Sequence, residues 1–215
     1  VFKSKILNMN LKFNFAYNES SLNIYNSFFR SKNLSFKNKS LITLKPFLDS
    51  NSKFEIENID VEIFKKLKID KLLKSKDILK KINTKNEVNF NSKKFSSSFF
   101  DKLNLKFDLA YGRLNYSKKL SILDDIFQCM GNINLLEEFP LLFFDCSINS
   151  EAKGDLLKKF KINIKKDNET FNLNVKGDLN ILNQKINFKD ISLNENYKAS
   201  NEDLNYFKEN FENIL

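Results

Sequence analysis

The chain has 215 residues, of which 41% are hydrophobic and 29% are charged, and its formal net charge is +9 at pH 7. That is enough apolar material for one core or one long sheet. The absence of His excludes Ser-His-Asp triads and His-ligated zinc, and four Gly leave no glycine-rich phosphate loop, so we expect no enzyme, no metal and no cofactor.

The first predicted element is a long strand over residues 7–17, where apolar and polar residues alternate. Successive side chains of a strand point to opposite faces, so the alternation gives this strand one apolar and one polar face. Its apolar side is formed by Leu7, Met9, Leu11, Phe13, Phe15 and Tyr17. Weaker alternation predicts strands at 22–29, 33–37, 40–44 and 53–57, and short connections favour antiparallel neighbours.

Residues 59–82 break this alternation. Apolar residues recur there at roughly helical spacing between lysines, which predicts an amphipathic helical insert. The lysines from Lys65 to Lys81 are interpreted as the solvated face of that helix. Contact with an anionic membrane surface is the alternative.

The clearest alternation after the insert lies at residues 103–111, preceded by a weaker strand at 87–91. Its apolar side is formed by Leu103, Leu105, Phe107, Leu109 and Tyr111, which face away from Asn104, Lys106 and Asp108. We therefore expect a second long strand with one apolar face.

A hairpin is predicted from strands at 126–136 and 141–148, with its loop at residues 137–140. If the loop is centred between Glu137 and Glu138, residues whose numbers add up to 275 face each other, and Cys129 meets Cys146. Opposed side chains in such a ladder are close enough for a disulfide in an oxidising compartment. The favoured interpretation is two buried thiols on one strand face, and the disulfide is the alternative.

The C-terminal part of the sequence predicts another hairpin and a helix. Phe160, Ile162 and Ile164 alternate with lysine and asparagine, and so do Phe171, Leu173 and Val175 with asparagine. The turn-forming residues between these two runs favour a hairpin. Strands at 179–182 and 186–191 follow, and Ser200 with Asp203 resembles a capping box that starts a helix.

These elements predict a mainly β fold with minor α content. Long antiparallel amphipathic strands would form a curved open sheet or groove, divided as a β segment at 1–58, a helical insert at 59–84, a continuing β segment at 85–198 and a helix at 199–215. A soluble protein does not leave a large apolar sheet face in water, so that face needs an occupant or a second protein layer.

The basic charge does not by itself predict a nucleic-acid partner. The 36 basic residues comprise 34 Lys and only two Arg, Arg30 and Arg113, and 32 residues are Asn. This is the bias expected of an AT-rich gene. Proteins that bind phosphates or recognise bases usually do so through bidentate hydrogen bonds from arginine guanidinium groups. With only two Arg, we expect no nucleic acid as partner.

The alternating strands LNMNLKFNFAY and LNLKFDLAYGRLNY, and the run from KKFKINIKK to the helix start YKASNEDLNYF, resemble the AsmA-like family with its YhdP-like and TamB-like relatives. The resemblance implies a β-groove protein of the bacterial envelope, periplasmic and anchored in the inner membrane, which carries phospholipid towards the outer membrane. The anchor would lie outside this chain, and flanking regions would meet the membrane surface.

On this interpretation the apolar strand faces line one continuous groove that binds acyl chains without any chemistry. The groove residues expected are Leu7, Met9, Leu11, Phe13, Phe15, Leu103, Leu105, Phe107, Leu109, Phe160, Ile162, Ile164, Phe171, Leu173 and Val175. The alternative is a structural or adhesive β-sandwich or solenoid whose apolar faces pack on each other. Lipid identity, transport direction and oligomeric state are left open by the sequence.

Overall fold

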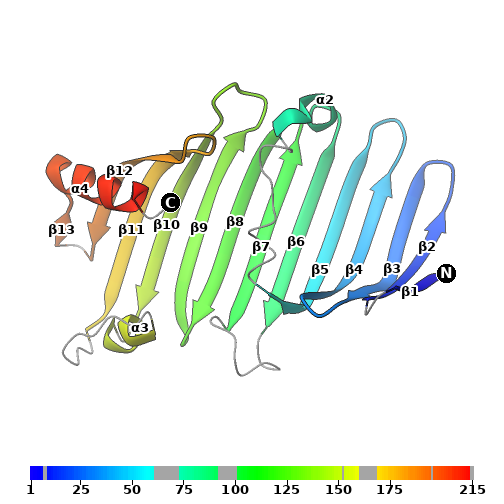
Figure 1. The fold of residues 1–215 in the computed structure, drawn as a ribbon, viewed down its shortest axis with the longest axis horizontal. Helices are drawn as coiled ribbons and strands as arrows, with labels where there is room; N and C mark the ends of the chain where they lie inside the picture. Colours follow the sequence, from blue (N-terminus) through cyan, green and yellow to red (C-terminus); the bar gives the residue numbers. More distant parts are fainter. Residues whose placement is uncertain are drawn as a thin grey trace. The chain divides into compact units, whose positions relative to one another are not determined.

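A computed structural model describes residues 1–6, 9–60, 73–91, 101–151, 153–159, 169–194 and 196–213. The described residues are mainly β, with 64% in strands. Their thirteen strands form an open sheet in which the order of neighbours follows the order along the chain (Figure 1). The expected mainly β, open sheet with a C-terminal helix is therefore confirmed.

The elements of the first half are β1 (Phe2–Ile6), β2 (Met9–Tyr17), β3 (Ser21–Arg30), β4 (Leu34–Thr43), β5 (Asp49–Ile59), α2 (Lys76–Leu79) and β6 (Asn83–Asn91). The elements that follow are β7 (Lys102–Ala110), β8 (Arg113–Ile122), β9 (Asp125–Asn134), β10 (Leu141–Ser150), α3 (Lys153–Lys159), β11 (Phe171–Asn180), β12 (Lys185–Leu193), β13 (Tyr197–Lys198) and α4 (Asn201–Glu212).

The chain divides into two compact units. Unit 1 comprises Val1–Asn91 with Asn104–Leu114, and unit 2 comprises Ser92–Leu103 with Asn115–Leu215. In both units alternate residues of a strand point to opposite sides of the sheet, so each strand contributes side chains to two faces.

Unit 1 departs from the antiparallel rule at one place. Strands β1 to β5 pair with their neighbours antiparallel, whereas β5 and β6 pair in parallel, with Asp49 opposite Asn83 and Ile56 opposite Phe90. Parallel neighbours need a long crossover, and the segment between Ile59 and Asn83 supplies it. The predicted helical insert is thus the crossover; residues 61–72 lie outside the described residues, and α2 is its described helix.

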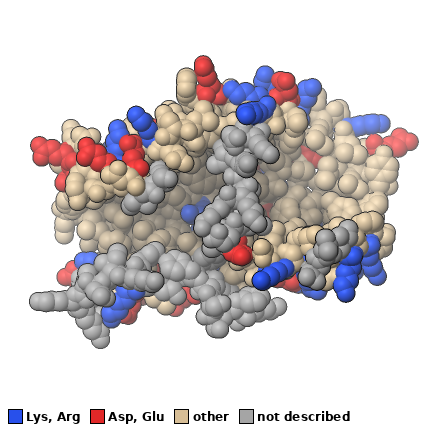
Figure 2. Space-filling view, in the orientation of Figure 1, with Lys and Arg blue, Asp and Glu red and all other residues tan. Residues whose placement is uncertain are grey.

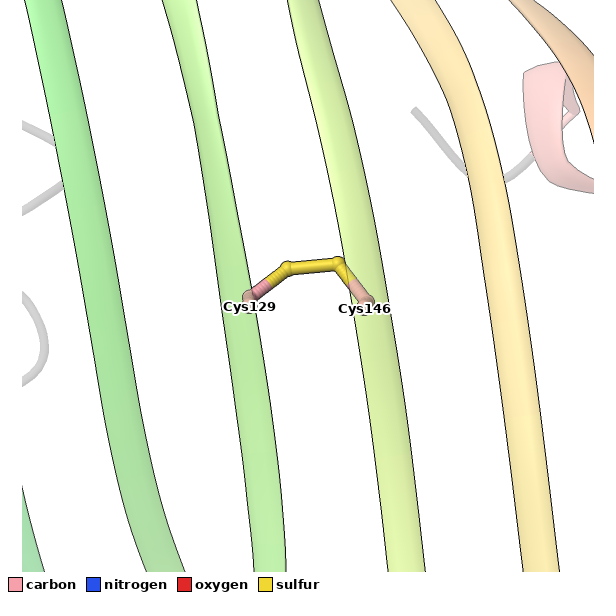
Figure 3. Close-up of a disulfide and its surroundings, with 2 residues drawn as sticks. All are labelled: Cys129 and Cys146. Carbon is pink, nitrogen blue, oxygen red and sulfur yellow. A yellow bond between two sulfur atoms is a disulfide. The ribbon is translucent and has the colours of Figure 1, made fainter.

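Unit 2 contains the predicted hairpin in the predicted register. In β9 and β10, Cys129 faces Cys146, Gly131 faces Phe144, and Ile126 faces Asn149. A disulfide joins the two cysteines across the strands (Figure 3). The bonded alternative is therefore the one that the structure adopts.

Three predicted details are wrong. The runs 33–37 and 40–44 form one strand, β4, because Asn38 and Lys39 continue the ladder with β5. Residues 179–180 belong to the end of β11 and are not a separate strand. The hairpin predicted between 160–165 and 171–175 disagrees with the pairing of β11, whose neighbours around Leu173 and Val175 are β10 and β12; residues 160–168 lie outside the described residues.

The C-terminal helix begins as the sequence predicts. The Ser200 side chain accepts a hydrogen bond from the Asp203 amide, and the Asp203 carboxylate accepts one from the Ser200 amide, which completes a capping box. Helix α4 packs against β12, where the ring centroids of Phe188 and Phe211 lie 5.9 Å apart.

Candidate functional site

The predicted groove residues of β2 lie on one side of unit 1. Phe13 and Phe15 have ring centroids 5.6 Å apart, and Leu11 follows on the same side. Met9 keeps 39% and Phe15 keeps 42% of its surface exposed, although both are large apolar residues. Leu7 lies outside the described residues. We call the side of unit 1 that carries these residues its apolar face.

Aromatic and aliphatic side chains continue across the neighbouring strands of this face. The ladder places Leu11 opposite Phe29, Phe29 opposite Phe36 and Phe36 opposite Ile56. The ring centroid of Phe36 lies 5.6 Å from that of Phe29 and 5.6 Å from that of Phe54. Aromatic pairs at this separation stabilise a sheet by more than the burial of their surface alone. The row is therefore a packed part of the apolar face.

The apolar face of unit 1 also carries a polar patch that the sequence analysis missed. Ser50 donates to Thr84 over 2.7 Å, Asn86 donates to the same hydroxyl over 2.8 Å, and Asn38 donates to Ser40 over 3.0 Å. The ladder connects these residues through Ser40 opposite Ser52 and Ser52 opposite Asn86. We call them the hydroxyl–amide patch: Asn38, Ser40, Ser50, Ser52, Thr84 and Asn86.

This patch changes the expectation of one continuous apolar lining. It is uncharged, and Ser40 and Ser52 within it are buried. Its neighbours along the same strands are apolar, with Phe54 and Ile56 on β5 and Val88 and Phe90 on β6. The apolar face of unit 1 can therefore offer neutral hydrogen bonds beside aromatic side chains. A sequence signal exists in the alternate Ser residues of DSNSKF, but their faces cannot be assigned without the register.

Strand β7 carries four more of the predicted residues, Leu103, Leu105, Phe107 and Leu109, and all are half-buried. Their neighbour Asn104 points to the other side, where it donates to Glu87 over 3.2 Å and to Asn89 over 2.7 Å. The predicted division of this strand into an apolar and a polar side is therefore confirmed.

In unit 2 the predicted residues of β11 also share one side. Val175 faces Cys146 and Leu173 faces Ile148, so these β11 side chains lie beside the disulfide hairpin, and Phe171 follows at the strand end. All three predicted residues are half-buried. Phe160, Ile162 and Ile164 lie outside the described residues. Figure 2 shows the side of unit 2 that α4 covers as a hollowed, mainly uncharged surface with charges along its borders.

The opposite side of unit 1 is charged. Glu57 pairs with Arg30 at 3.2 Å and with Lys37 at 3.1 Å, and Lys53 pairs with Glu87 at 3.2 Å. The hydrogen bond from Lys37, with a further one from Arg30, lowers the pKa of Glu57 below its usual value. We call this side the charged face. The thickness of the sheet separates its ion pairs from the apolar face.

The described residues offer two kinds of surface, one apolar and one charged. Within them, no group of three His, Cys, Asp or Glu side chains is arranged to hold a metal ion. No helix of the described part has the length and apolar character that crossing a membrane requires.

Comparisons with protein-family models, curated proteins and solved structures gave no match to this chain.

Proposed function

We propose that the chain is a non-enzymatic lipid-binding protein whose apolar faces hold the acyl chains of phospholipid. The observation that carries this proposal is the exposure of large apolar side chains on the same side of a sheet, above all Met9 and Phe15. Each methylene that an acyl chain buries there contributes about 0.8 kcal/mol. A chain of a dozen carbons therefore gains roughly 10 kcal/mol before ordering costs.

The strand order favours this proposal over the self-packed alternative. A sandwich needs two sheets whose inner faces interdigitate. All described strands belong to a single sheet, so the described strands form no second sheet of this kind. The apolar side chains of β2 and β3 then need a different partner, and hydrocarbon from a lipid is one of matching chemistry.

The hydroxyl–amide patch supports an ester-linked amphiphile over plain hydrocarbon. Neutral hydroxyl and amide groups match ester carbonyls and glycerol oxygens, which need hydrogen bonds when they leave water. Aromatic residues lie next to the patch, so one lipid can contact both kinds of surface. Phospholipid therefore fits this face better than a free alkane does.

The disulfide supports the location implied by the resemblance to AsmA-like proteins. Cys129 and Cys146 are bonded, and disulfides persist in oxidising compartments such as the periplasm. We propose that the protein works in the bacterial envelope, between the inner and outer membranes, with its anchor outside this chain.

A pair of matched substitutions tests the proposal. Phe15 and Tyr25 are both 42% exposed, but β2 and β3 pair so that Phe15 opposes Ile24 and Tyr25 opposes Asn14, which places the two rings on opposite sides. Phe15→Asp should reduce the phospholipid that copurifies with the protein, measured by native mass spectrometry and lipid extraction. Tyr25→Asp should leave it unchanged. Absence of phospholipid from the unmodified protein, or equal loss in both variants, would contradict the proposal.

A further inference from the structure

We propose that the charged face of unit 1 contains a binding site for a phosphate group, formed by Lys3, Lys5, Lys12 and Arg30. These residues line an open depression of about 520 Å³ across β1, β2 and β3, with Phe28 as its apolar wall. Ligand sites of this volume hold a phosphate together with the group it is esterified to. The proposal concerns the side opposite to the apolar face, so it does not depend on acyl-chain binding.

The strand register concentrates positive charge at this depression. Lys3 lies directly opposite Lys12, and Lys5 lies opposite Asn10, which in turn faces Arg30. Like charges opposed across a ladder destabilise it, because their side chains start only about 5 Å apart. A bound anion between them would remove this repulsion.

Carboxylates do not neutralise the cluster. Lys3, Lys5 and Lys12 have no ion pair within the described parts of the chain, and the nearest acid in this network, Glu57, is shared by Arg30 and Lys37. One carboxylate therefore pairs with two cations, and the described carboxylates leave the lysines of β1 and β2 available to a ligand.

Arg30 is held in an orientation suited to an oxyanion. Its Nε donates to Glu57 over 3.2 Å, and its guanidinium carbon lies 4.6 Å from the centre of the Phe28 ring. In the described structure the terminal nitrogens of this guanidinium make no recorded hydrogen bond. Arginine forks of this kind bind phosphate through two parallel hydrogen bonds, and lysines add charge around them.

The charge and donor pattern selects phosphate among anions. A tetrahedral oxyanion can offer oxygens to the guanidinium and to several lysines at once, whereas a carboxylate has only two oxygens and so reaches fewer of these groups. Free phosphate and the phosphate of a lipid headgroup share this chemistry. The experiment therefore has to separate these two sources.

The test is a titration of the folded chain with inorganic phosphate, followed by NMR shifts of β1–β3 amides at constant ionic strength. Cosedimentation with vesicles of phosphatidylcholine alone, or with phosphatidylglycerol added, forms the second arm. Lys3→Gln combined with Lys12→Gln should weaken binding by about tenfold or more, because the double variant removes two of the positive charges that the phosphate would contact. Glu57→Gln, which releases Arg30, should strengthen it.

The matched control combines Lys106→Gln with Lys119→Gln, which removes the same charge from exposed positions outside the depression. Circular dichroism verifies that each variant is folded. Phosphate binding that only the Lys3 and Lys12 variant loses supports the site with free phosphate as a ligand. Loss confined to phosphatidylglycerol vesicles supports it with a lipid headgroup. Equal weakening in both variants, or no binding in either arm, would overturn the proposal.

Discussion

The ring of Phe144 occupies the space where a side chain on Gly177 would lie. Its Cζ atom is 2.7 Å from the position that a Cβ at Gly177 would take, and the carbonyl oxygen of Asn187 is nearer still. Gly131 repeats the relationship one strand earlier, because a Cβ there would overlap the Phe143 carbonyl and approach Tyr116 at 2.9 Å. Gly131 and Gly177 thus lie on either side of Phe144 across β9 to β11, and the missing side chain at Gly177 leaves room for its ring.

This relationship makes Gly177→Ala destabilising. Alanine ordinarily stabilises a strand relative to glycine by about 0.5–1 kcal/mol, because glycine loses more freedom on folding. At Gly177 the added methyl would displace Phe144 or the β12 backbone, and overpacking of this kind costs about 1–3 kcal/mol. Urea unfolding should therefore show a lower free energy of unfolding. Asn132→Ala on the exposed side of β9 is the control; a Gly177→Ala protein as stable as that control would refute the steric account.

Much of this arrangement could be predicted from the sequence, because the alternation of apolar and polar residues along a strand assigns each side chain to one face of the sheet. The register of Cys129 with Cys146 followed from the centre of a short loop alone. Strand β8 escaped prediction because Lys118 and Lys119 interrupt its alternation. Strand β1 is short and was not separated from the residues before β2.

Pairing over long distances could not be predicted in the same way. The parallel contact of β5 with β6 joins segments separated by the crossover, and alternation within each strand says nothing about direction. The hydroxyl–amide patch depends on that same contact, since Ser50 and Thr84 meet only in this register. The basic depression likewise requires β1, whose Lys3 and Lys5 gain significance only opposite β2.

Glu212 should protect the edge of the sheet in unit 2. Its Oε1 accepts a hydrogen bond of 3.0 Å from the backbone amide of Ile186, in the part of β12 that lies beyond the two residues paired with β13. Glu212→Ala should remove an interaction of about 1 kcal/mol and speed hydrogen exchange at the Ile186 amide. Glu212→Gln keeps an acceptor oxygen and should preserve most of the protection. Unchanged exchange at Ile186 in the alanine variant would show that the carboxylate does not cover this edge.

The start of α4 should weaken in acid. Hydrogen bonds from the Ser200 backbone and side chain, and then from Tyr197, lower the pKa of Asp203 below its usual 3.8. A group whose pKa is lower in the folded state stabilises that state fully above its unfolded pKa. The contribution is lost as pH falls from about 3.8 through the lowered value.

The measurement for Asp203 is the NMR signal of α4 amides as a function of pH. In the unmodified protein, fraying of Asn201 to Leu204 should increase below the ordinary carboxyl pKa. Asp203→Asn should fray at every pH and lose this dependence, whereas Glu202→Gln, in the same helical turn, should keep it. An acid transition that persists in Asp203→Asn would place its origin in another group.

The disulfide should stabilise unit 2 by restricting its unfolded state. Cys129 and Cys146 are separated by 17 positions in the sequence. A closed loop of that size contributes about 3 kcal/mol in the chain-entropy treatment. Cys129→Ala combined with Cys146→Ala should lower the free energy of unfolding by an amount of this order, measured by urea denaturation without reductant. Because both residues belong to one hairpin, residual pairing in the unfolded chain would reduce the loss.

Adding reductant should destabilise the unmodified protein to a similar extent and leave the double variant unaffected. If reductant leaves the unmodified protein equally stable, the disulfide contributes nothing to its folding.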